Sequence, residues 1–242
     1  MDLDDMNGYE ALRESAAWID LSARGKIRVN GVDRARLLHA LTTNHIQQLT
    51  PGADCYVFFL NALGRVLADD VTLEDTTART TTIAVEGPRS AEVLARIGAP
   101  VPQADYAFVP WGSRLVARLS SAGSPGFFVF APAGEQPALI AQLGIEQADA
   151  EAARIVRIEH GKPRYGEDIT DRFLAQETNQ SHALHFSKGC YPGQEIVERI
   201  RATAPAPGTR LTTQGNAAAE ITSAAFSPAL AKVVALAYVR TA

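Results

Sequence analysis

The chain has 242 residues, with 23 Lys or Arg against 27 Asp or Glu, so its formal net charge is −4. This length suits one large or two small domains, and 46% apolar residues are enough to form real cores. Global disorder is thereby excluded. The acidic balance argues against nucleic acid or an anionic membrane as a partner held by bulk charge.

The two cysteines, Cys55 and Cys190, supply neither a disulfide framework nor a paired CxxC zinc motif. The first 14 residues are acidic, whereas a signal peptide is basic and then apolar. The longest apolar runs, such as residues 233–239, are far shorter than the roughly 20 residues of a membrane span. We therefore expect a cytoplasmic protein with no membrane partner and no direct nucleic-acid partner.

The first hundred residues alternate turn signals with short strands and two helices. Period-two alternation indicates strands, and apolar residues at helical spacing after Asp33 indicate a helix. The order strand, strand, strand, helix favours an α+β layer. The expected elements are a strand at residues 26–30, a helix from Asp33 to about residue 41, hairpin arms at 55–60 and 65–73, a strand at 79–85 and a helix from Gly87 to Gly98.

The rest of the chain predicts more short elements around one long irregular stretch. Residues 162–193 are polar and rich in Gly, Pro, Asn and Gln, and a long loop inside a compact protein is usually functional or disordered. The expected elements are hairpin arms at 114–120 and 126–131, helices at 136–143 and 148–160, and strands at 209–214, 220–226 and 232–240.

The most unusual segment is KGCYPGQE, residues 188–195. Gly189 and Gly193 allow positive φ or the close approach of a ligand. A thiol on a loop beside Lys188 has surroundings that lower a thiol pKa and raise its reactivity. Equally, Cys190 is explained as a small side chain that merely packs.

Other clusters give weaker signals. His182 and His185 precede Cys190, but three ligands without a fourth indicate no metal. Residues 157–168 suit a planar polar ligand or a solvated helix end. Asp69 and Asp70 alternate across a strand, so only one faces inward and they do not form a dyad. The chain lacks GxGxxG, Walker, GxSxG and HExxH motifs, which leaves nucleotide hydrolysis, dinucleotide redox chemistry and zincin proteolysis without support.

The octapeptide at residues 188–195 resembles the signature of the folate-binding YgfZ-type proteins, which are related to the aminomethyltransferase (T-protein) of the glycine cleavage system. Further matches run along nearly the whole chain in the family's order. They include residues 20–33, 41–44, 60–65, 86–88, 157–166, 176–177, 220–223 and 227–230.

The resemblance implies a T-protein-like cloverleaf of ferredoxin-like α+β domains around a central folate site, with a small C-terminal β-barrel. Residues 1–50 and 148–204 would form a discontinuous first domain, and residues 51–147 the second. Residues 205–242 would form the barrel, which is too short to be stable alone and must be stabilised by contacts with the other domains.

The resemblance also implies that tetrahydrofolate or a derivative is the cofactor, that Glu177 hydrogen-bonds the pterin and that Arg210 lies near the folate. Cys190 would be the functional thiol and Lys188 would tune it. Other residues carried over as folate-binding are Asn61, Tyr165, Gly189, Gly193 and Gln194.

Two functions follow from the resemblance. The cysteine signature implies an accessory protein that supports assembly or repair of iron-sulfur clusters in client enzymes, including tRNA-modifying ones. Asp69 occupies roughly the place of the transferase's catalytic acid, so a folate-dependent aminomethyl or other one-carbon transferase is the alternative. Ala68 and Arg65 depart from the transferase pattern.

Overall fold

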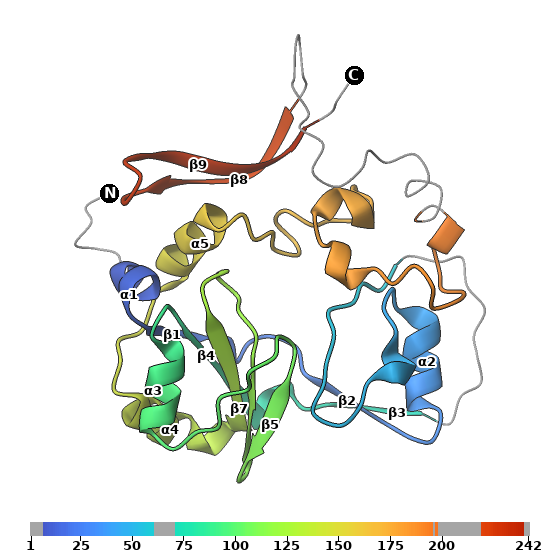
Figure 1. Ribbon diagram of the computed structural model, residues 1–242, viewed down its shortest axis with the longest axis horizontal. Helices are drawn as coiled ribbons and strands as arrows, with labels where there is room; N and C mark the ends of the chain where they lie inside the picture. The colour runs from blue at the N-terminus through green and yellow to red at the C-terminus, as the bar shows by residue number, and fades with distance from the viewer. Residues whose placement is uncertain (1–6, 61–70, 196, 198–218, 240–242) are drawn as a thin grey trace.

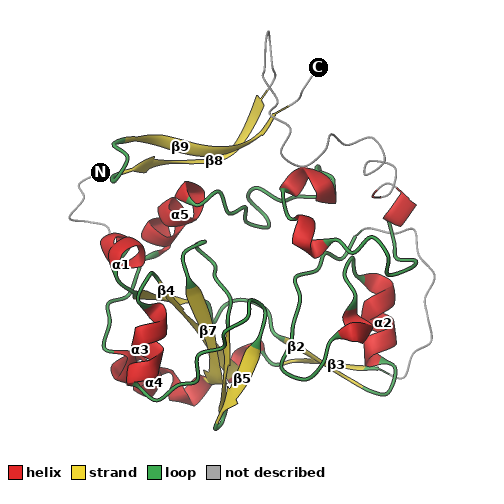
Figure 2. Cartoon of the chain, in the orientation of Figure 1, coloured by secondary structure: helices red, strands yellow, loops and turns green. Residues whose placement is uncertain are grey.

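The computed structural model describes residues 7–60, 71–195, 197 and 219–239, and the remainder is drawn as a grey trace (Figure 2). Three predicted site residues, Asn61, Asp69 and Arg210, lie outside the described residues. No helix of the described part is long and apolar enough to cross a membrane.

An antiparallel five-stranded sheet forms the larger half of the molecule, in the order β1-β4-β7-β6-β5. Its central pair joins β4 and β7 along seven residues each, from Thr80 opposite Pro132 to Glu86 opposite Gly126. The strands are β1 (Ala17–Asp20), β4 (Thr80–Glu86), β5 (Phe108–Trp111), β6 (Arg114–Ala117) and β7 (Gly126–Pro132).

Both faces of this sheet are covered because successive strand residues point to opposite sides. Ile83 and Val85 face the helices α3 (Ser90–Arg96) and α4 (Gln136–Leu143). Ala84, between them, faces α1 (Tyr9–Glu14) and α5 (Ala150–Glu159). The sheet therefore lies between two helical layers, each with its own apolar core (Figure 1).

The other half of the molecule is built around helix α2 (Arg34–Leu41) and the two-stranded sheet of β2 (Ile27–Asn30) and β3 (Thr72–Asp75). Between α5 and Gly193 the chain has short 3-10 turns, including Ala175–Thr178 and Ser181–Ala183, and a helical stretch begins at Gln194. In Figure 1 this stretch runs from α5 across to α2, so the two halves and the irregular stretch surround the centre of the view.

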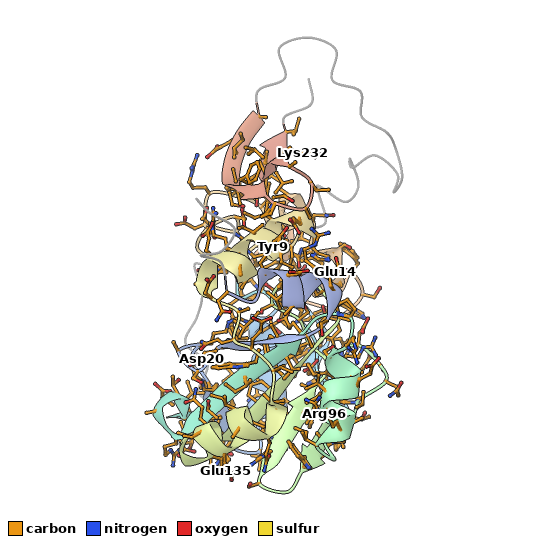
Figure 3. All side chains as sticks on the ribbon, turned by 90° about the vertical axis from the view of Figure 1, so that its left-hand side faces the viewer. Tyr9, Glu14, Asp20, Arg96, Glu135 and Lys232 are labelled. Atoms are coloured by element: carbon orange, nitrogen blue, oxygen red, sulfur yellow. The ribbon has the colours of Figure 1, made fainter. Side chains whose placement is uncertain are left out.

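A hairpin of β8 (Ala219–Ser227) and β9 (Lys232–Val239) packs on α5. Figure 3 shows Lys232 at the hairpin end of the molecule, with Arg96 and Glu135 towards the opposite end. The predicted C-terminal barrel includes residues 205–218 and 240–242, which lie outside the described residues, so the barrel stays a prediction.

Most predicted elements are confirmed. The helix at residues 136–143 ends at Gly144 with φ +56, and the predicted strands at 26–30, 79–85, 220–226 and 232–240 correspond to β2, β4, β8 and β9. Helix α1 and strands β1 and β5 were not predicted. The hairpin predicted at residues 55–73 lies partly outside the described residues. Its arm at 55–60 is extended and bridged at Phe59 to Thr42, while β3 pairs with β2.

The predicted division into residues 1–50 with 148–204, 51–147 and 205–242 stays a prediction. Both sheets join strands from the two sides of residue 50, because β1 pairs with β4 and β2 pairs with β3. An antiparallel α+β architecture is what the element order indicated.

Candidate functional site

Residues 188–195, here called the Cys190 loop, are exposed at the thiol and anchored beneath it. Gly189 and Gly193 have φ of +93 and +80, a region in which other residues are strained. A Cβ on Gly193 would also lie 3.1 Å from Cδ1 of Leu60. The two glycines predicted to shape the loop therefore do so through backbone conformation.

Lys188 anchors this loop to helix α2. Its side chain is buried, and Nζ donates to the carbonyl oxygens of His39 and Thr42 at the end of that helix. In return, the Lys188 carbonyl lies 3.1 Å from Nε2 of His39. An ammonium at a helix C-terminus satisfies carbonyl oxygens that have no partner within the helix.

The Lys188 ammonium also lies 4.9 Å from the centre of the Tyr191 ring. It interacts electrostatically with a second thiol, that of Cys55. Burial raises the pKa of Cys55, Asp54 raises it further, and Lys188 opposes both. The charge of Lys188 therefore favours the thiolate of Cys55. The predicted influence of Lys188 on the Cys190 thiol stays a prediction.

The Cys190 side chain has one hydrogen-bond donor beside it. Nε2 of Gln194 lies 3.6 Å from Sγ of Cys190, and Oε1 of the same amide accepts from the Tyr191 N–H at 3.1 Å. Because a backbone N–H must face the oxygen, the amide nitrogen faces the sulfur. This segment lines an open hollow of about 480 Å³ together with Ala40 of α2.

Three imidazoles gather where the loop meets α2. The His39 and His45 ring centres are 4.5 Å apart, and the His45 and His185 centres are 5.2 Å apart. Burial lowers the pKa of His39, and Lys188 lowers it further. No group of three or more His, Cys, Asp or Glu among the described residues could hold a metal ion.

A second group of side chains, here called the aromatic shelf, comprises Tyr56, Tyr106 and His182. His182 stacks on Tyr106 with ring centres 5.7 Å apart and lies 5.4 Å from the Tyr56 ring. Tyr56 is 38% exposed and His182 is also exposed. Rings from three separate segments, two of them exposed and that of Tyr106 half-buried, form a surface on which a flat ligand can stack.

Cations lie beside the shelf. Burial lowers the pKa of Arg24, as does Arg164, and Tyr56 is among its electrostatic neighbours. Burial likewise lowers the pKa of Lys162, whose Nζ donates to Ser120 O at 2.5 Å. Arg24 is solvent-exposed although burial lowers its pKa, which fits a side chain surrounded by protein but reached by water. Within the described part of the chain, these three cations form no ion pair.

Asp54 lies at the edge of the shelf and is the most strongly perturbed acid. Burial raises its pKa to about 6, and its Oδ1 has no hydrogen-bond partner among the described residues. Perturbed acids of this kind occur preferentially at functional sites. Asp54 belongs to none of the motifs that the sequence analysis identified. The sequence feature that could have indicated it is its position directly before the apolar run at residues 55–60.

The charged segment at residues 157–168 has a structural role. Nη1 of Arg157 donates to Oδ2 of Asp168 at 2.5 Å, and both side chains are buried. The hydroxyls of Thr222 and Ser223 each donate to Oδ1 of Asp168 at 2.6 Å. Arg157 and Asp168 thus belong to a buried network, and a ligand site in the rest of this segment stays a prediction.

The other described residues of the predicted site are Tyr165 and Glu177. Tyr165 is 78% exposed. Glu177 is exposed, and its Oε2 accepts from the Leu174 N–H at 2.8 Å, which caps the 3-10 turn at Ala175–Thr178. Ala175 of that turn packs in one apolar cluster with Tyr191 of the Cys190 loop, and the predicted roles of Tyr165 and Glu177 stay predictions.

Known proteins share the fold of this chain. The GCVT N-terminal domain family matches residues 6–71. A glycine cleavage system aminomethyltransferase T from Bartonella henselae has the same fold, with a TM-score of 0.79 at 21% identity, over 96% of this chain and 80% of that protein. This chain has the T-protein fold.

The sequence of this T-protein-like chain is also similar to aminomethyltransferases. One from Rubrobacter xylanophilus is 26% identical over 96% of this chain and 78% of its own length. A chloroplastic protein of Arabidopsis thaliana, named as a transferase, is 24% identical over 90% of this chain. The chain spans 64% of the length of that plant protein.

Proposed function

We propose that this protein binds a reduced folate and supports the assembly or repair of iron-sulfur clusters in cytoplasmic client enzymes, including tRNA-modifying ones, as a YgfZ-type member of the T-protein relatives. Cys190 is the functional thiol. The observation that carries the proposal is the Cys190 loop, where a buried Lys188 fastens the backbone to α2 and leaves the sulfur exposed beside a hollow.

The aromatic shelf fits a folate. A folate combines flat rings with a glutamate that bears two carboxylates. Tyr56 and His182 offer exposed rings, and Arg24 and Lys162 offer positive charges that form no ion pair within the described residues, with the buried carboxylate of Glu86 acting on both. Bound there, tetrahydrofolate would supply a carrier for one-carbon groups. Glu177 and Arg210 remain proposed contacts, the first to the pterin.

Replacement of Cys190 tests the proposal. In cells that depend on this protein, Cys190→Ala should lower the activity of iron-sulfur enzymes several-fold, while the purified variant binds reduced folate as tightly as the wild type. Cys55→Ala is the matched control, because it removes the other thiol from the same region. An unchanged phenotype in the Cys190→Ala strain would sink the accessory role.

The alternative is transfer of an aminomethyl or other one-carbon group. Similarity to aminomethyltransferases over 96% of the chain favours it. It requires that the purified wild-type protein form methylenetetrahydrofolate from an aminomethyl donor and that Asp69→Asn abolish this. Formation of that product would favour the alternative, and its absence with several donors would count against it.

A further inference from the structure

Among the described residues, one buried carboxyl oxygen lacks a hydrogen-bond partner. Oδ1 of Asp54 is buried, and no described residue donates to it. A buried acceptor gives up its hydration, and in folded proteins such an atom nearly always regains a hydrogen bond from protein, water or ligand. The missing donor is therefore the feature that needs explaining.

The backbone places Asp54 against the aromatic shelf. Its N–H donates to Tyr106 O at 2.8 Å, and the preceding residue, Ala53, bridges Ala107. Both Asp54 and Tyr56 act electrostatically on Tyr106, so both side chains lie near its hydroxyl. Asp54 consequently lies beside Tyr106 of the shelf.

The charges around Asp54 leave the carboxyl group without compensation. Burial alone accounts for its raised pKa, and no described cation acts on it. Its titratable neighbours are Tyr106 and Cys55, whose own pKa values are raised by burial and also by Asp54. Neither neighbour neutralises the carboxylate, so an N–H group supplied from outside the protein would meet no competing donor.

We propose that Asp54 is a ligand-binding and specificity-determining residue, whose carboxylate accepts a hydrogen bond from a ring N–H or amino group of a flat N-heterocycle stacked on Tyr56, Tyr106 and His182. The inference rests on the proposed function, since the pterin of a reduced folate carries such donors on its pyrimidine edge. A ring without these donors would leave the buried oxygen unpaired and would bind more weakly.

The test is calorimetric titration of the full-length protein with 5-methyltetrahydrofolate between pH 5 and 8. The variant is Asp54→Asn, which keeps the side-chain shape but removes the carboxylate. Asp105→Asn is the matched control, because Asp105 also neighbours Tyr106 but is exposed and pairs with Arg118. The ratio of variant to wild-type Kd cancels any titration of the ligand itself, and circular dichroism verifies that each variant is folded.

At pH 8 the Kd of Asp54→Asn should exceed that of the wild type by about tenfold or more, the range for a hydrogen bond to a charged group. Towards pH 5, where the wild-type carboxyl is protonated, the ratio should approach one. Asp105→Asn should match the wild type throughout. Equal affinities of Asp54→Asn and wild type at every pH would overturn this inference alone. Failure of the wild type to bind at any pH would overturn the proposed function and this inference with it.

Discussion

At the scale of single residues, Asp54 makes stability depend on pH. Its folded pKa of about 6 lies above the ordinary value of 3.8, so the unfolded chain releases this proton first as pH rises. The favourable contribution of Asp54 to the free energy of folding is complete below pH 3.8 and is lost as the pH rises through about 6. Ionisation of Asp54 therefore destabilises the fold at neutral pH.

Asp54→Asn should therefore stabilise the protein at pH 8, by about 1 kcal/mol once partial solvation of the site is allowed for. Near pH 4 the gain should vanish, because the acid is then neutral in the folded protein too. Urea unfolding at the two pH values measures it. A variant that is less stable than the wild type at pH 8 would show that the carboxylate has a structural partner.

At the scale of elements, the Cys190 loop depends on a contact distant in sequence. The Lys188 ammonium bonds carbonyl oxygens of residues that precede it by 149 and 146 positions. Thr43 adds a second connection, since its hydroxyl donates to Ala183 O at 2.6 Å and accepts from the Phe58 N–H at 2.9 Å. These hydrogen bonds thus connect the Cys190 loop, the end of α2 and the segment at 54–60 to one another.

Lys188→Met should detach the loop from α2 without disturbing the five-stranded sheet. Loss of the ammonium leaves two carbonyl oxygens unpaired, which costs about 2 kcal/mol. Hydrogen exchange should accelerate in residues 182–195 and at the end of α2, but not in β4 or β7. Lys26→Met is the control, since Nζ of Lys26 also bonds two carbonyl oxygens but only within four residues of itself. Exchange unchanged by Lys188→Met would contradict the anchoring role.

The sequence predicts an element well where the pattern that determines it lies within a few residues. Helical spacing and Gly144 indicate α4, and short runs bounded by turn signals indicate β4 and β9. Helix α1 and strand β1 are too short to show a repeating sequence pattern, and β1 forms a strand because it pairs with the edge of β4. The Cys190 loop was predictable because its members are consecutive. The aromatic shelf was not, since chain folding brings its three residues together.

At the scale of the whole molecule, the hairpin β8–β9 is attached to α5 mainly by buried polar groups. The Asp168 carboxylate accepts hydrogen bonds from Thr222, Ser223 and Arg157. The Tyr238 hydroxyl donates to the backbone carbonyl oxygen of Asp168 at 2.9 Å. Burial opposes ionisation of Asp168, but the hydrogen bonds from Ser223 and Thr222 outweigh it and lower its pKa below 3.8. The attachment is therefore complete at neutral pH and weakens only as pH falls below about 4.

Asp168→Asn should release this hairpin, because the buried Arg157 loses one of its two charged partners and keeps only Glu167, which costs about 2 kcal/mol. Limited proteolysis at neutral pH should then cleave within residues 219–239 before it reaches the five-stranded sheet. Glu220→Gln is the matched control on the same strand, where an exposed pair with Arg172 contributes less than about 1 kcal/mol. If both variants resist proteolysis like the wild type, apolar packing of Val234 and Leu236 on the α5 core holds the hairpin instead.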